Sequence, residues 1–296
     1  MMSAKQDTSN DTTSCCASCG AAEVDDIKLK DCPTCKSARY CSDTCKENHR
    51  PEHEEACKKR AAELRDELLF RQPKSTHRGD CPICLLPFPL DISQFVYHSC
   101  CSKFTCKGCL VANLRRLKDE RLEHSCPFCR EVTGKSDVKK MNIKRVQAND
   151  PNAMCKMGIE CYSKGNYLEA FQYSSKAAEL GHADAHCQLA SMYREGQVVE
   201  KDEKKEIYHW EEAAIKGHLD ARVCLAQYDA SNGRDDRAIK HYIIAANLGH
   251  DRSLTVLKEC YKVGIVSKED FASALRAYQV AVNATKSPQR EAAKLI

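Results

Sequence analysis

The cysteine pairs are the residues of this sequence with the clearest chemistry. Two pairs between residues 81 and 130 open on Cys-Pro-x-Cys, and a third cluster lies between them: Cys81 and Cys84; Cys101, Cys106 and Cys109; Cys126 and Cys129. A Cys-x-x-Cys pair places two thiolates on one tight turn, at the separation that a tetrahedral Zn²⁺ requires. A single pair would also fit a redox motif, but the repetition of the spacing indicates zinc.

A second array of the same kind precedes the first. It consists of four close pairs: Cys16 and Cys19, Cys32 and Cys35, Cys41 and Cys45, His53 and Cys57. The last two pairs are four residues apart, which places each pair on one face of a helical turn. A module of this length cannot bury enough apolar surface to fold alone, so metal binding must supply its folding free energy.

The array from residue 81 to 130 resembles a RING finger, in which eight ligands hold two zinc ions in interleaved fashion. The resemblance implies Cys81, Cys84, Cys106 and Cys109 for one zinc, and Cys101, Cys126 and Cys129 for the other. The RING pattern has a histidine two residues after the third ligand, where this sequence has Lys103, whose ammonium cannot be a ligand. Cys100 is the preferred substitute, with His98 and His124 as alternatives. A finger with one zinc and an incomplete second site is a further alternative.

The array from residue 16 to 57 resembles a MYND finger, most specifically in Tyr-Cys-Ser-x-x-Cys at residues 40–45 and in the closing His-x-x-x-Cys. The resemblance implies two sites, formed by Cys16, Cys19, Cys41 and Cys45 and by Cys32, Cys35, His53 and Cys57. Cys15 competes with Cys16 as the first ligand, and Cys16 is preferred because it completes the Cys-x-x-Cys spacing. His49 is left outside the metal shell. The two arrays together predict about four zinc ions per chain.

An internal repeat begins after residue 150. The sequence Gly-His-x-Asp-Ala occurs at residues 181–185 and 217–221, with a degraded copy at 249–253, and a pair of small residues precedes each copy. Such units cannot bury their faces alone and must stack. The second copy, which contains Trp210, resembles a Sel1-like repeat, a relative of the tetratricopeptide repeat. Histidines 182, 218 and 250 and the five cysteines of this region are expected to be structural.

These patterns predict two small zinc-stabilised α+β modules followed by an all-α solenoid of about four helix pairs. The expected segments are a disordered tail (1–14), the MYND-type finger (15–57), a helix and linker (58–80), the RING-like finger (81–130), a basic linker (131–150) and the repeats (151–296). Within the RING-like finger, a helix is expected over residues 110–122. The basic linker could also serve as a nuclear-localisation patch.

Composition restricts the class of protein. The chain has 296 residues, 21 cysteines and a net charge of only +4, so bulk charge gives no indication of nucleic-acid binding. Sixteen of the cysteines precede residue 130, in metal-like spacings rather than the spread of a secreted disulfide scaffold. No apolar run approaches the ~20 residues of a membrane span, and no signal peptide is recognisable. We therefore expect a cytoplasmic or nuclear protein that does not bind membranes.

Function is expected to come from surfaces. The sequence has no phosphate-binding loop or nucleophile motif, and each zinc site offers four protein ligands with no open position for catalysis. The RING resemblance implies an E3 ubiquitin ligase that positions a ubiquitin-charged E2 conjugating enzyme through Ile83, Pro127 and Arg130. The MYND resemblance implies binding of proline-containing peptides, and the repeats imply protein docking. The alternative is a non-catalytic scaffold, because the expected central helix of the finger lacks the usual tryptophan.

Overall fold

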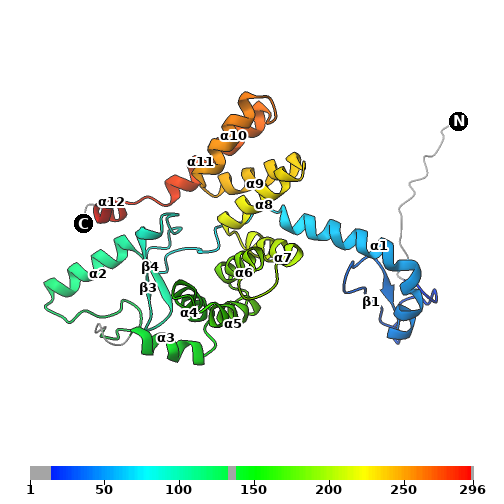
Figure 1. The fold of residues 1–296 in the computed structure, drawn as a ribbon, viewed down its shortest axis with the longest axis horizontal. Coiled ribbons are helices and arrows are strands. Elements are labelled where there is room, and N and C mark those ends of the chain that lie inside the picture. The colour runs from blue at the N-terminus through cyan, green and yellow to red at the C-terminus, as the bar shows by residue number, and fades with distance from the viewer. Residues whose placement is uncertain (1–14, 133–137, 295–296) are drawn as a thin grey trace. The chain divides into compact units, whose positions relative to one another are not determined.

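A computed structural model describes residues 15–132 and 138–294. The tail predicted to be disordered, residues 1–14, lies outside the described residues. The chain divides into two compact units, Met1–Leu69 and Phe70–Ile296, and each is treated separately below (Figure 1).

The first unit is a small module with little apolar core. Strands β1 (Lys30–Asp31) and β2 (Arg39–Tyr40) form an antiparallel pair, and a long helix, α1 (Asp43–Leu69), follows. The buried cluster combines Leu29, Ala38 and Tyr40 with three buried thiols, those of Cys16, Cys32 and Cys35. Because half of this core consists of candidate ligands, apolar burial alone stabilises the module weakly.

The second unit begins with a two-stranded hairpin and a helix. After a 3-10 turn (Ile92–Gln94), strand β3 (Phe95–His98) pairs with β4 (Lys103–Cys106), and α2 (Lys107–Asp119) follows directly. Helix α2 begins three residues before the position expected from the sequence. Lys103 starts β4 opposite His98, and its ammonium lies 5.2 Å from the centre of the Phe128 ring. Lys103 is therefore a strand residue that packs on an aromatic ring.

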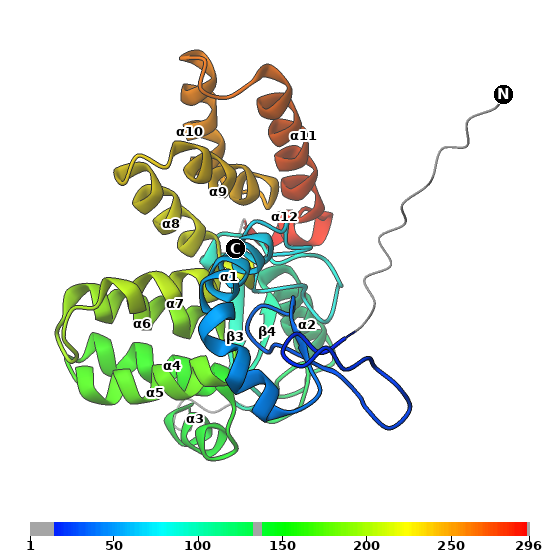
Figure 2. The same ribbon diagram turned by 90° about the vertical axis from the view of Figure 1, so that its right-hand side faces the viewer.

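Helices make up the rest of the second unit (Figure 2). Helix α3 (Val138–Gln147) lies within the segment that the sequence predicted to be a linker. Four antiparallel pairs follow, and then a short last helix: α4 (Pro151–Ser163) with α5 (Tyr167–Glu179), α6 (Ala183–Glu195) with α7 (Glu203–Ile215), α8 (Leu219–Ser231) with α9 (Asp235–Asn247), α10 (Asp251–Lys262) with α11 (Lys268–Ala284), and α12 (Pro288–Lys294). Among the described residues, no helix combines the length and apolarity that crossing a membrane requires.

The repeated sequence motif connects successive helix pairs. The small pairs at 213–214 and 245–246 are completely buried, and they allow neighbouring helices to approach closely. The motif histidine then starts the next helix: the Nδ1 atoms of His218 and His250 accept backbone N–H groups of Ala221 and Ser253. His218 also links two copies of the motif, because its Nε2 lies 3.0 Å from Oδ1 of Asp184. Both histidines thus have a structural role at the start of a helix.

Candidate metal centres and interaction surface

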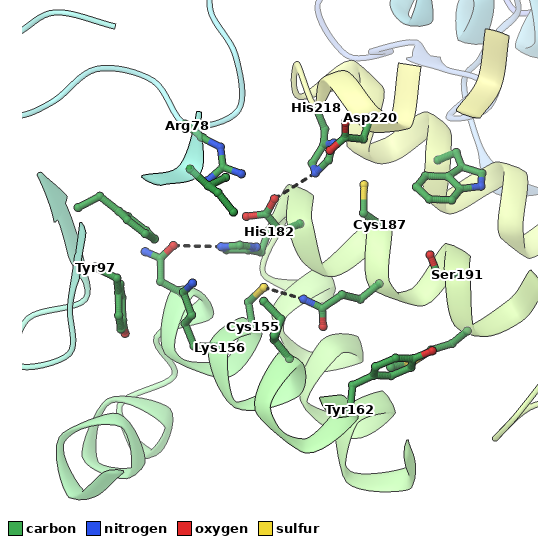
Figure 3. A pocket seen from close by; sticks show the side chains of 18 of the residues that line it. Arg78, Tyr97, Cys155, Lys156, Tyr162, His182, Cys187, Ser191, His218 and Asp220 are labelled. Atoms are coloured by element: carbon green, nitrogen blue, oxygen red, sulfur yellow. Dashed lines mark hydrogen bonds and ion pairs between the residues drawn. The ribbon is translucent and has the colours of Figure 1, made fainter. Parts of the chain in front are cut away.

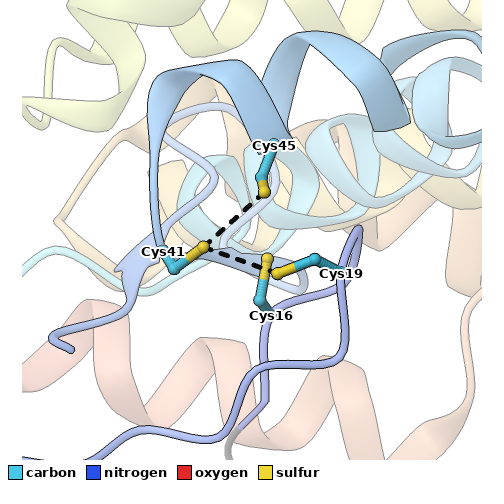
Figure 4. A group of neighbouring side chains, drawn as sticks. All are labelled: Cys16, Cys19, Cys41 and Cys45. Atoms are coloured by element: carbon cyan, nitrogen blue, oxygen red, sulfur yellow. Dashed lines mark hydrogen bonds between the residues drawn. The ribbon is translucent and has the colours of Figure 1, made fainter.

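Sixteen side chains that the sequence singled out as ligands lie in four groups. Within each group the donor atoms all lie within 4.8 Å of one another, and the groups are Cys16, Cys19, Cys41 and Cys45; Cys32, Cys35, His53 and Cys57; Cys81, Cys84, Cys106 and Cys109; and Cys100, Cys101, Cys126 and Cys129. Figure 4 shows how the four sulfur atoms of the first group converge. The third and fourth groups, both in the second unit, interleave along the chain. Ligands of the third group lie on both sides of Cys100 and Cys101 of the fourth group.

The same backbone turn holds four of the Cys-x-x-Cys pairs, those that begin at Cys16, Cys32, Cys81 and Cys126, whereas the fifth pair, Cys106 and Cys109, lies at the start of α2. The N–H of the residue after the second cysteine donates to the carbonyl of the first, with N···O distances of 2.8–3.0 Å. That residue has a positive φ in all four turns: 74° at Gly20, 56° at Lys36 and Leu85, and 58° at Arg130. Three of these residues are not glycine, and such strain costs roughly 1–3 kcal/mol at each position unless the surroundings compensate for it. A metal ion bound by both thiolates of each turn would provide that compensation.

The first cysteine of these turns is prepared to ionise. The backbone N–H of Cys19 is directed at the sulfur of Cys16 and lowers its pKa to about 6. Burial alone would raise the pKa of Cys81, but the backbone N–H groups of Cys106 and Cys84 bring it down to about 7. The thiolate is the form that binds metal, so the turns stabilise the ligand form of the sulfur.

The other thiols of each group need a nearby cation in order to ionise. The pKa of Cys41 rises to about 12 because its sulfur hydrogen-bonds those of Cys45 and Cys19. Burial and the neighbouring Cys126 raise the pKa of Cys101 to about 11. Four thiolates cannot share so small a volume without a positive charge among them. Zn²⁺ fits all four groups, since it prefers tetrahedral Cys₄ and Cys₃His sites. The chain is thus compatible with several zinc ions.

The structure also places the residues between which the sequence left a choice. Cys100 lies in the fourth group, whereas Nε2 of His98 is 2.9 Å from the hydroxyl of Thr105 and His124 is exposed. Cys16 is buried within the first group, while Cys15 is exposed and outside it. The Nδ1 atom of His49 lies 3.0 Å from the hydroxyl of Tyr40. This geometry favours Cys100 and Cys16 as ligands, with His49 outside the metal shell.

A fifth group of possible ligands has a different character. His77, Asp184 and His218 meet in the second unit, where both histidines place Nε2 3.0 Å from Oδ1 of Asp184. Since Nδ1 of His218 accepts the Ala221 N–H, the proton of this imidazole is on Nε2 and is donated to Asp184. A metal at Nε2 would require the opposite tautomer. We therefore interpret this group as a hydrogen-bonded link. No spacing in the sequence indicated His77, and Asp184 was recognised only as part of the repeated motif at residues 181–185.

A cavity of about 640 Å³ lies between the hairpin of the second unit and its repeat helices (Figure 3). Aromatic side chains of the hairpin, Tyr97 and Phe104, line one side, and residues of α4 and α7 such as Lys156 and Trp210 line the other. Nδ1 of His182 is buried beside the cavity without a hydrogen-bond partner among the described residues. The cavity thus combines aromatic surface with a few polar groups, as ligand-binding pockets do.

The three residues expected to contact an E2 enzyme are accessible. The side chain of Ile83 is 44% exposed. Pro127 is half-buried and Arg130 is exposed. Within the part of the chain that the structure describes, the Arg130 guanidinium forms no hydrogen bond or ion pair. All three side chains therefore have surface to offer a partner.

Comparison with known families identifies two parts of the chain. The MYND finger model matches residues 16–57, and the Sel1 repeat model matches residues 151–182, 183–218 and 235–250. The chain therefore carries a MYND finger and a helical solenoid of the Sel1 type, as predicted. These parts define a zinc-binding protein-interaction scaffold, since Sel1 repeats mediate protein–protein contacts.

Two solved structures resemble the chain. One is a Sel1 repeat protein from Oxalobacter formigenes, with 23% identity over 57% of this chain and 71% of that chain and a TM-score of 0.42. The other is a protective antigen of uropathogenic Escherichia coli strains that displays an SLR fold, with 20% identity over 58% of this chain and 37% of that chain and a TM-score of 0.41. No curated protein sequence matches the chain.

Proposed function

We propose that this protein is a RING-type E3 ubiquitin ligase that uses residues 81–130 to position an E2–ubiquitin conjugate. The observation that carries the proposal is the interleaving of the two cysteine groups around a hairpin and a helix. In this order each metal joins two distant parts of the segment, which is the arrangement of a RING finger. The four groups hold four zinc ions in this proposal, with Cys100 completing the last site.

The finger would act by holding its partner in a reactive pose. Ile83, on the first metal-binding turn, supplies exposed apolar surface for the E2 enzyme, and Pro127 of the last turn is the second apolar residue proposed to contact it. Arg130 follows the last ligand, and its planar guanidinium has several donors with which to bridge the E2 enzyme and ubiquitin. Such a ligase needs no nucleophile of its own, because positioning lowers the barrier of the transfer.

The other parts of the chain would recruit substrates. The MYND finger binds proline-containing segments in this proposal, and the cavity between hairpin and repeats takes a second segment of a partner protein. The aromatic rings and polar groups that line this cavity could hold the side chains and backbone of an extended peptide. The substrates are therefore proteins, bound at sites separate from the E2-binding surface.

The proposal is tested by ubiquitin discharge from a panel of E2 enzymes with the purified full-length chain. Arg130→Ala should slow discharge about tenfold or more, because each lost charge-assisted hydrogen bond is worth roughly 1.5–3 kcal/mol. Arg121→Ala is the matched control, since Arg121 is also an exposed arginine with a positive φ in the same finger. Ile83→Ala should weaken E2 binding itself.

The second candidate function is a scaffold without ligase activity. It is favoured by the absence of tryptophan from α2, the helix that would contact the E2 enzyme. Absence of discharge with every E2 enzyme, or equal rates for Arg130→Ala and Arg121→Ala, would support the scaffold. Zinc content and melting temperature of each variant must match wild type for the comparison to count.

A further inference from the structure

Arg290 of α12 lies against the first metal group of the RING-like finger. Its guanidinium donates to the carbonyls of Pro87 (2.6 Å), Thr285 (2.8 Å) and Leu86 (3.1 Å), and Nη2 lies 3.2 Å from the sulfur of Cys84. The residue is only 5% exposed. A side chain from the end of the chain is thus buried beside a candidate ligand that lies about 200 positions earlier in the sequence.

The buried positive charge of Arg290 requires a negative charge close to it. Among the described residues no carboxylate pairs with it, and its neutral acceptors are all backbone carbonyls. A buried guanidinium without a counter-charge is strongly unfavourable. The thiolate of Cys84 supplies negative charge, and four thiolates around one Zn²⁺ leave the whole group with a net negative charge. The burial of Arg290 is therefore explained when the group is ionised around a metal.

A glycine in the finger allows this approach. A Cβ atom at Gly108 would lie 3.0 Å from both Cα and Cγ of Arg290, which is tighter than most Cβ contacts in proteins and would require a small shift of α12. The backbone carbonyl of Gly108 also accepts a hydrogen bond from Gln289, the neighbour of Arg290 on α12 (3.2 Å). Gly108 stands between the ligands Cys106 and Cys109, so α12 packs directly on the metal-binding segment.

We propose that Arg290 is a positioning residue of this zinc site, which holds Cys84 and neutralises the charge of the metal group. Docking of α12 and retention of zinc are then coupled: each strengthens the other. Among the described residues, no guanidinium or ammonium group contacts a sulfur of the second zinc site of the finger. There Arg145 of α3 donates to the backbone carbonyl of Cys100, at 2.6 Å and 3.1 Å. The two ends of the finger are therefore held in chemically different ways.

Zinc release from the full-length chain to a chromogenic chelator tests the proposal. In Arg290→Met, one zinc equivalent should leave roughly ten- to a hundredfold faster than in wild type, as for other partners of metal ligands. Arg290→Lys keeps the charge and should recover most of the retention. Gln289→Ala is the matched control, because it removes a hydrogen bond of the same helix without changing the surroundings of sulfur.

Two outcomes would overturn the proposal. One is release from Arg290→Met at the wild-type rate; the other is equal acceleration by Gln289→Ala, which would mean that helix docking matters and the guanidinium does not. If Arg290→Met does not fold, hydrogen exchange of residues 288–294 in the wild-type chain decides instead. Protection that is lost on zinc removal supports the coupling, and protection that is unchanged contradicts it.

Discussion

The MYND finger and the cysteine-rich segment of residues 81–130, the second finger of our proposal, have similar groups of candidate ligands but different surroundings. Each has two groups of four donors and two Cys-x-x-Cys turns of the same geometry. The first finger lies in a compact unit of its own with α1, whereas the second shares a unit with the repeats and receives Arg145 and Arg290 from flanking helices. The same ligand chemistry can therefore belong to a self-contained module or to part of a larger core, and ligand spacing does not distinguish the two.

Zinc removal should produce the largest difference between the regions. Residues 16–57 should unfold completely, because structural zinc supplies about 10–16 kcal/mol to such modules. The repeats have a core of their own around Met154, Leu189 and Met192, so most of the helical circular dichroism should persist in chelator. A fragment from Asn149 onward should melt cooperatively without metal. Melting of that fragment by chelator would show that its histidines or cysteines bind metal.

Metal content should be close to four zinc ions per chain, as measured by elemental analysis. Cys100→Ser should lower the content by one, because Cys100 lies with Cys101, Cys126 and Cys129. His98→Ala is the matched control and should leave the content unchanged, since the His98 imidazole pairs with Thr105. If His98→Ala loses a zinc ion and Cys100→Ser does not, the assignment of the fourth ligand is wrong.

Acid should destabilise the repeats by a different route from the fingers. Burial beside Arg222 lowers the pKa of His241 to about 3 in the folded chain, against 6.5 for an exposed histidine. Protonation therefore favours the unfolded state, and the stability present above pH 6.5 is lost as the pH falls. At pH 5 the loss should be about 2 kcal/mol. Denaturant titrations of His241→Gln should show a correspondingly flatter pH dependence; an unchanged one would contradict the assignment.

The smallest effect is expected at Ser37, which donates to a ligand sulfur of the first finger as Arg290 does in the second. There the Ser37 hydroxyl donates to the sulfur of Cys35 (3.0 Å), and this bond offsets burial to hold the Cys35 pKa at about 6. A hydrogen bond from a neutral donor contributes about half the free energy of one from a charged donor. Ser37→Ala should therefore lower the free energy of unfolding by about 1 kcal/mol and accelerate zinc release only a few-fold. An effect as large as that of Arg290→Met would mean that charge is not what distinguishes the two fingers.

Local spacing was sufficient to predict the MYND finger, the Sel1 repeats and the helix pairs. The close pairs and the Gly-His-x-Asp-Ala motif each lie within one or two turns of chain, so the residues adjacent in sequence are enough to predict the structure that they form. Contacts across long separations were not predictable in this way. Helix α3 was missed because its sequence is polar and lysine-rich, and it contacts the finger through Arg145. The burial of Arg290 beside Cys84 depends on tertiary packing that no local pattern records.

The link between His218 and Asp184 makes the repeat motif complementary to itself. The histidine of the copy at residues 217–221 binds the aspartate of the copy at residues 181–185, so these two copies are joined head to tail. The last copy has Arg252 where the earlier ones have Asp184 and Asp220. A further histidine would meet a cation there rather than a carboxylate. In the terms of polymer chemistry this copy is a chain terminator for links of this kind, and the helix pair that it begins, α10 and α11, is followed by α12.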